Sequence, residues 1–111
     1  MEINIQDFND MKIVEITGNF NSDSVSSFKE KIYPLLYSKC KIVAINMGKV
    51  DHIDSTGIGG LVSAMKTAKG ENKEFLLYDF NDKVRNFFDE IGLKNFFKTM
   101  SKEEFNLKYK I

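Results

Sequence analysis

The sequence predicts an α/β fold, with a mixed, mostly parallel β-sheet of four to five strands and about four helices. Along the chain, apolar residues switch repeatedly between strand-like runs and helical spacing, and strands that alternate with helices favour a parallel sheet. Residues 41–47 are almost continuously apolar, as in a central strand that is covered on both faces. With 111 residues, of which 42% are apolar, we expect one domain over residues 1–111.

The chain is expected to open with an antiparallel hairpin, which makes the sheet mixed. Ile3 and Ile5 alternate with polar residues, a pattern typical of a half-buried strand. Asn9-Asp10 provides a tight turn into a second strand over residues 11–17.

A helix is predicted next, after the polar segment 21–24, whose side chains are suited to capping its first turn. One face of this helix carries its apolar residues, namely Val25, Phe28, Ile32, Leu35 and Leu36. Pro34 removes a backbone donor and should kink or shorten the helix.

The middle of the sequence predicts a strand, a loop and a helix in succession. The strand covers residues 41–47, and the loop that follows contains Asp51 and His52. Helical apolar spacing then runs from Ser55 to Ala68, with Gly70 as a C-terminal stop.

The rest of the chain predicts two further strands and two further helices. Residues 75–78 form a strand, after which Asn81 caps a helix that Gly92 ends. Residues 96–100 are expected to form a short edge strand, and the sequence Ser-Lys-Glu-Glu at 101–104 forms a capping box for the last helix.

Composition argues against several classes of function. Sixteen basic and sixteen acidic residues cancel, so we expect no nucleic-acid or membrane partner. The first residues lack the pattern of a signal peptide and no apolar run is long enough to span a membrane, so a cytoplasmic location is expected. Cys40 and His52 are the only residues of their types, so a Cys/His metal cluster is not possible, and no cofactor is expected. No phosphate-binding glycine motif is present, and His52 lies too close along the chain to Ser55 for a usual catalytic triad. An enzyme is therefore not expected.

The segment Asp54-Ser55-Thr56-Gly57-Ile58-Gly59-Gly60 is the main candidate site. It lies where a central strand passes into a helix, at the edge of the sheet where open α/β folds usually place functional loops. Three glycines near a helix start each cost up to ~1 kcal/mol relative to alanine. Small residues recur at helical spacing, at positions 57, 60, 64 and 68. This stripe can pack inside the domain or dock a partner.

Ser55 has two possible roles. Serine is a favoured N-cap, so its hydroxyl could simply bind a free backbone N–H of the first turn. A helix N-terminus also tolerates a phosphate, because free N–H groups and the helix dipole stabilise an anion. The residues alone leave both roles open.

Three segments together resemble the STAS-domain family of bacterial anti-sigma factor antagonists. His52-Ile53-Asp54-Ser55-Thr56-Gly57-Ile58-Gly59 resembles the signature of the family, and Ile16-Thr17-Gly18-Asn19-Phe20 resembles its strand-end segment. Residues 84–93 look like its third helix and the turn after it. The resemblance covers essentially the whole chain in the right order.

The resemblance implies a partner-switching regulator. The unphosphorylated form would bind an anti-sigma factor that is also a serine kinase of the histidine-kinase-like ATPase type, and so release a sigma factor. Ser55 would be the phosphoacceptor, and a PP2C-type phosphatase would restore the active form. The resemblance implies that the partner-binding surface is formed by the residues around Ser55 and by the loop expected near it. These residues are Asn21, Asp54, Thr56, Gly57, Ile58, Gly59 and Gly60.

One departure from the family pattern concerns Asn21, because that loop often carries an acidic residue. The loop is expected near the phosphoacceptor, so the amide bears on which kinase binds and how tightly. A non-switching STAS scaffold, in a stressosome-like or lipid-transport complex, is the alternative, with Ser55 serving only as a helix cap.

Overall fold

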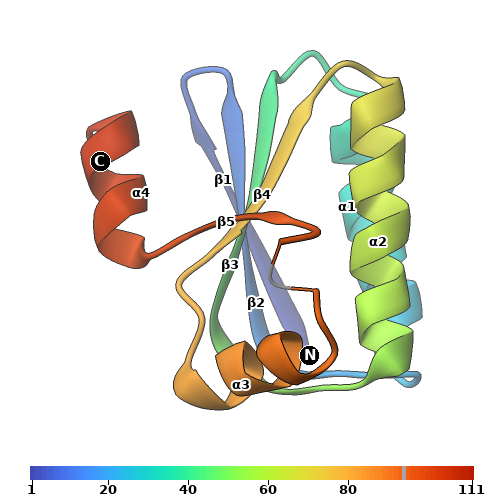
Figure 1. Cartoon of the computed structure of the whole chain (residues 1–111). Helices are drawn as coiled ribbons and strands as arrows, with labels where there is room; N and C mark the ends of the chain where they lie inside the picture. Colours follow the sequence, from blue (N-terminus) through green and yellow to red (C-terminus); the bar gives the residue numbers. More distant parts are fainter. Residues whose placement is uncertain (94) are drawn as a thin grey trace.

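A β-hairpin opens the fold and supplies one edge of a five-stranded sheet (Figure 1). The computed structural model describes residues 1–93 and 95–111. In sheet order the strands are β1 (Glu2–Phe8), β2 (Met11–Phe20), β3 (Ile42–Ile53), β4 (Glu74–Tyr78) and β5 (Lys98–Met100). Only β1 and β2 pair antiparallel, and the other neighbours are parallel. The predicted mixed, mostly parallel α/β sheet is confirmed.

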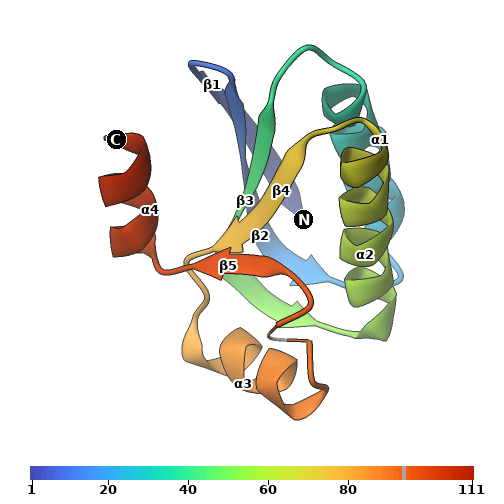
Figure 2. The same cartoon turned by 45° about the horizontal axis from the view of Figure 1, so that its top comes forward.

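Four helices are distributed unequally around this sheet. They are α1 (Val25–Leu36), α2 (Ser55–Gly70), α3 (Asp82–Glu90) and α4 (Lys102–Tyr109). Helices α1 and α2 lie side by side over one face, α4 lies over the other, and α3 sits at the end where β3 passes into α2 (Figures 1 and 2). In the described part of the chain, no helix is both long and apolar enough to cross a membrane.

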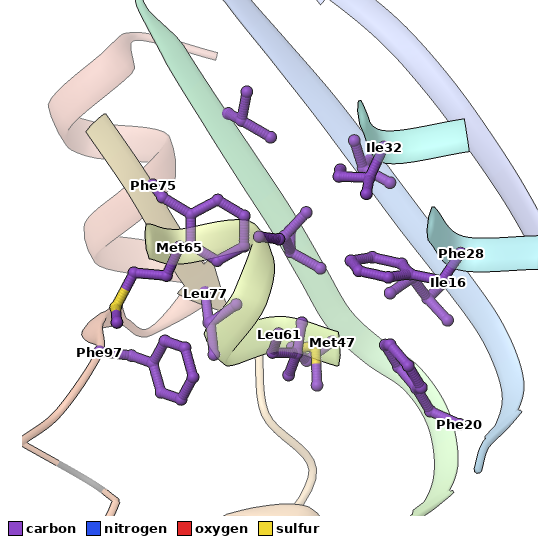
Figure 3. Packing of buried hydrophobic residues seen from close by; sticks show 14 of the residues in the cluster. Ile16, Phe20, Phe28, Ile32, Met47, Leu61, Met65, Phe75, Leu77 and Phe97 are labelled. Carbon is purple, nitrogen blue, oxygen red and sulfur yellow. The ribbon is translucent and has the colours of Figure 1, made fainter. Parts of the chain in front are cut away.

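The main core lies between the sheet and the pair α1 and α2 (Figure 3). Its large, fully buried members include Ile16, Phe20, Phe28, Ile32, Met47, Leu61 and Leu77. A smaller cluster lies under α4, where the rings of Tyr78 and Phe105 stack at 3.8 Å. Burial raises the pKa of Tyr78 to about 12, so its phenol stays neutral.

Local signals in the sequence predicted several element ends correctly. Phe8 pairs with Met11 across the two-residue turn, and Asn81 caps α3 by accepting from the Val84 backbone N–H at 2.9 Å. The capping box of α4 is present. Gly92 has a φ of 72°, the left-handed conformation that ends α3.

Two strands are longer than predicted, which corrects the placement of Asp51 and His52. They lie in β3, which continues to Ile53, and not in a loop. The cause is long-range pairing: β2 also continues to Phe20, and the two strands keep their ladder through register shifts after Glu15 and Gly18. Because this extension contains polar, exposed residues, its sequence does not show the apolar run by which the strand was recognised.

The first helix departs from the prediction at its N-terminal end and agrees with it at its C-terminal end. Ser24 occupies its N-cap position, but its side chain does not bond the first turn. Its hydroxyl donates instead to the Asn19 carbonyl oxygen at 2.8 Å. Pro34 lies inside α1, and the helix ends soon after it, at Leu36.

Candidate functional site

The predicted site forms where β3 passes into α2 beside the end of β2. The backbone N–H of Asp54 donates to the carbonyl oxygen of Phe20 at 3.2 Å. This bond extends the pairing of β2 and β3 by one step and fixes the start of α2 against the end of β2. Ser55 is the first helical residue and is exposed.

Asp54, not Ser55, is the N-cap of α2, so the predicted capping role of Ser55 is wrong. The Asp54 side chain accepts a hydrogen bond from the Gly57 backbone N–H at 3.0 Å. Its backbone is extended, with φ −117° and ψ −175°, whereas the chain is helical from Ser55 onward. A cap needs extended geometry, and only residue 54 has it. A carboxylate there also suits the positive end of the helix dipole.

The stripe of small residues on α2 faces the interior, which decides between the two alternatives for it. A Cβ atom on Gly57 would lie 2.4 Å from the carbonyl oxygen of Phe20, and one on Gly60 would lie 2.8 Å from Cγ2 of Val25. Both glycines are buried, as are Ala64 and Ala68 further along the stripe. The stripe lets α2 approach β2 and α1, and it is not a docking surface.

Gly59 differs from the two buried glycines. It is exposed, and a Cβ atom built on it would meet nothing within 4 Å. Packing within the chain therefore does not account for a glycine that costs ~1 kcal/mol in a helix. With Asp54, Ser55 and Thr56 it makes up the exposed part of the motif, which we call the α2 start surface.

The remaining predicted partner-binding residues are divided by burial. Ile58 is only 7% exposed and belongs to the core, so it supports the α2 start surface from below. The predicted contribution of Gly57, Ile58 and Gly60 to a partner surface is therefore corrected to an internal, supporting one. Because these three residues are packed in the core, they fix the helix start and so fix the positions of its exposed residues.

Asn21 organises the loop that follows β2. The side-chain oxygen of Asn21 accepts from the Asp23 backbone N–H at 3.0 Å, and the backbone N–H of Asn21 donates to the Ser24 hydroxyl at 3.0 Å. Asn21 directly follows Phe20, whose carbonyl binds Asp54, so this loop borders the α2 start surface. A carboxylate could accept the same bond from Asp23. The amide therefore keeps the turn and removes one negative charge.

A groove beside the site contains residues that sequence reasoning had not assigned to it. Asn19, Asp51, His52, Asn81 and Lys83 line an open hollow of about 610 Å³ between the strand ends and α3. The amide nitrogen of Asn81 donates to the Val50 carbonyl at 2.6 Å and so fixes α3 to β3. The Lys83 ammonium lies 3.4 Å from Nε2 of His52.

One signal for this groove was present in the sequence. Lys83 lies in the first turn of α3, where the helix dipole disfavours a cation. A charge placed against the dipole suggests a role outside the helix. The strand extension that carries His52 could not be recognised, because it depends on pairing with β2.

The surface carries polar groups that can form hydrogen bonds with a partner. It presents a hydroxyl, carboxylate and amide groups and a lysine on an open face. Among residues 1–93 and 95–111, no group of three or more His, Cys, Asp and Glu side chains could hold a metal ion. The exposed hydroxyl of Ser55 is instead available to a second protein.

Sequence comparison finds a matching family model and curated relatives that cover most of the chain. A family model described as the STAS domain matches residues 2–106. The anti-sigma-B factor antagonist of Staphylococcus aureus is 26% identical over 97 residues, which cover 86% of this chain and 90% of the relative. The relative is named for antagonism of another protein and not for a reaction, in agreement with the expectation that this chain is not an enzyme.

Solved structures show the same fold. An anti-sigma factor antagonist from Mycobacterium paratuberculosis superposes with a TM-score of 0.85 at 14% identity, over 99% of this chain and 94% of that one. The unphosphorylated form of the antagonist SpoIIAA gives 0.73 at 14% identity, over 96% of each chain. The phosphorylated form of Bacillus SpoIIAA superposes with a TM-score of 0.69 at 16% identity, over 93% of this chain and 95% of that one.

The capping assignment predicts unequal effects of two neighbouring substitutions. Asp54→Ala removes the acceptor of the Gly57 N–H and should lower the free energy of unfolding by about 1 kcal/mol. Ser55→Ala should change it by less than ~0.5 kcal/mol, since Ser55 has no part in the cap. Urea unfolding of both variants measures the difference. A larger loss in Ser55→Ala would contradict the assignment.

The three glycines should respond differently to the same added methyl group. Gly57→Ala places Cβ against a backbone oxygen and should destabilise the domain by ~1–3 kcal/mol. Gly60→Ala should cost less, because the Val25 side chain can move. Gly59→Ala should stabilise the domain by about 0.5–1 kcal/mol, because its site is open. Thermal and urea unfolding rank the three, and a loss in Gly59→Ala would show that the open space is needed internally.

Proposed function

This chain belongs to the STAS-domain family, and on that premise we propose that it is an anti-sigma factor antagonist controlled by phosphorylation of Ser55. The unphosphorylated form binds an anti-sigma factor that is also a serine kinase, and the sigma factor is released. The observation that carries the proposal is the position of Ser55, exposed at the start of α2 while Asp54 caps the helix.

The division of roles in the motif supports a switch at this serine. Asp54 satisfies the Gly57 N–H, and Gly57 and Gly60 provide the close packing. The stability of the helix start therefore does not depend on the Ser55 hydroxyl. A modification there leaves the cap and the core as they are, so the domain can carry it while folded.

A phosphate on Ser55 would act on the partner through charge. It adds roughly −1.5 to −2 charges beside the Asp54 carboxylate. The helix end itself tolerates this anion, because of its free N–H groups and its dipole. A partner shaped for a neutral hydroxyl would have to desolvate the new charge, so binding weakens without unfolding.

The surface around Ser55 supports a protein partner. Gly59 leaves the helix surface flat without an internal reason, which suits the close approach of another backbone. The Asn21 loop and the groove with His52 and Lys83 extend the same end of the domain. The similar antagonist SpoIIAA has been solved in unphosphorylated and phosphorylated forms, which supports a fold that accepts a phosphate.

The full cycle needs two further proteins of defined chemistry. The kinase is an ATPase of the histidine-kinase-like type, which transfers the γ-phosphoryl group of ATP to the Ser55 oxygen and leaves ADP. A PP2C-type metal-dependent phosphatase hydrolyses the phosphoserine and returns the binding form. Both are assigned from the family and act in the cytoplasm, the kinase on the Ser55 hydroxyl and the phosphatase on the phosphate ester, which water cleaves to the hydroxyl and inorganic phosphate.

Phosphorylation can be tested directly by mass spectrometry. Incubation with the candidate kinase and ATP should add one phosphate to the wild type and to Thr56→Ala, but none to Ser55→Ala. Thr56 is a matched control, since it is the next residue and its hydroxyl-bearing side chain is also exposed. Phosphate on Thr56, or on Ser55→Ala, would overturn the assignment of the site.

The same experiment separates the switch from a scaffold. A kinase that binds the chain tightly but never modifies it would favour a non-switching STAS subunit, in a stressosome-like or lipid-transport complex. Binding of the unmodified chain together with modification of Ser55 is the result that the proposal requires.

A negative charge at residue 55 should imitate the modified form. Ser55→Asp is expected to weaken binding to the kinase at least tenfold, with a melting temperature close to that of the wild type, because the helix dipole accepts the charge. Ser27→Asp introduces the same change at an exposed position in the first turn of α1 and serves as control. Calorimetric titration gives both affinities, and equal binding by Ser55→Asp and wild type would contradict an electrostatic switch.

A further inference from the structure

In the part of the chain that the structure describes, the outer edge of β1 is a long strand edge with no neighbouring strand. β1 is the terminal strand, it is seven residues long, and it pairs only with β2. Its register with β2 runs from Glu2 to Phe8 without a shift. The other edge of the sheet, β5, has only three residues. The backbone N–H and C=O groups on the outer side of β1 are therefore available for pairing.

This edge lacks the usual features that prevent strands of two molecules from pairing. Lysine, proline and β-bulges commonly serve that purpose, and β1 contains no lysine, no proline and no register shift. Its two acids lie near its ends, and Asp7 is already paired with Lys12 of β2. At its centre Ile5 is 39% exposed, an apolar side chain without full cover.

The sequence of β1 is compatible with itself in an antiparallel arrangement. When two copies pair about a two-fold axis at Ile5, all seven residues of each strand find a partner. Asn4 then faces Gln6, two amides that can bond each other, and Ile5 faces Ile5 of the second copy. Glu2 falls opposite Phe8 and Asp7 opposite Ile3, so no acid faces an acid.

We propose that this chain forms a two-fold dimer through antiparallel pairing of β1 with β1 of a second copy, centred on Ile5, which joins the two sheets. The interface is isologous and closes at two subunits, because each edge is used once. The dimer does not involve the motif at the start of α2. The proposal is independent of the proposed function, and its test needs no kinase.

The solution mass tests the dimer. Sedimentation equilibrium of the wild type should show a rise from 12.8 kDa toward twice that value as the concentration increases into the hundreds of micromolar. Ile5→Lys places a charge at the centre of the edge and should remain at 12.8 kDa over the same range. Ile91→Lys is the matched control, since Ile91 is a similarly exposed isoleucine (43%) that lies at the C-terminal end of α3 and not in β1, and it should associate as the wild type does.

Cysteine cross-linking tests the register, in a background in which Cys40 is replaced by alanine. Ile5→Cys should form a disulfide-linked dimer under mild oxidation, because residue 5 faces itself. Asp7→Cys should not, because the two sulfur-bearing residues would lie ~14 Å apart along the strands, beyond disulfide reach. A monomeric wild type, equal loss of association in Ile5→Lys and Ile91→Lys, or preferential cross-linking of Asp7→Cys would each overturn the proposal.

Discussion

The close approach of α2 to the end of β2 is the contact on which the site depends. The carbonyl oxygen of Phe20 accepts from the Asp54 N–H and lies only 2.4 Å from the position that a Cβ atom of residue 57 would take. A side chain at position 57 would push the helix away from the strand, and the bond to Asp54 would lengthen. Phe20 is itself fully buried against Phe28 of α1, so this contact is anchored in the core.

This contact divides the motif into residues that face inward and residues that face outward. Once residue 57 is fixed against β2, the helical period turns Ile58 and Gly60 toward the core and leaves Ser55, Thr56 and Gly59 outside. Asp54 is left at the junction, where its extended backbone makes it the cap. Of the exposed residues, only Asp54 helps to hold the helix in place, as its cap, so Ser55, Thr56 and Gly59 are free of a structural role.

Much of the fold was predictable because its signals are local. Turn residues, the caps at Asn81 and Ser101, and helical apolar spacing all act over a few neighbouring positions, and these predictions are confirmed. The extension of β3 was not predictable, because its polar residues are held by pairing with β2. The cap at the start of α2 was missed for a related reason: Asp54 and Ser55 are both good cap residues, and only the end of the β2 ladder decides which one is extended. The inward direction of the glycine stripe likewise depends on Phe20 and Val25, which are distant in sequence.

The position of Asn21 beside the start of α2 depends on the same contact. The loop that it organises follows Phe20 directly, so the hydrogen bond to Asp54 brings this loop to the start of α2. An aspartate here would preserve the turn through the same acceptor oxygen, but it would add a second carboxylate near Ser55, beside that of Asp54. Exposed charges interact weakly, so the amide changes the repulsion felt by a phosphoserine by ~1 kcal/mol at most.

The larger consequence concerns the partner, because an amide can donate a hydrogen bond where a carboxylate can only accept. For the proposed kinase, a cation offered to this loop would gain less from the neutral Asn21 than from a carboxylate, whereas an acceptor could bind the Asn21 amide N–H. Residue 21 is therefore a candidate determinant of partner choice, and the substitution of an amide for a carboxylate there does not require a different fold.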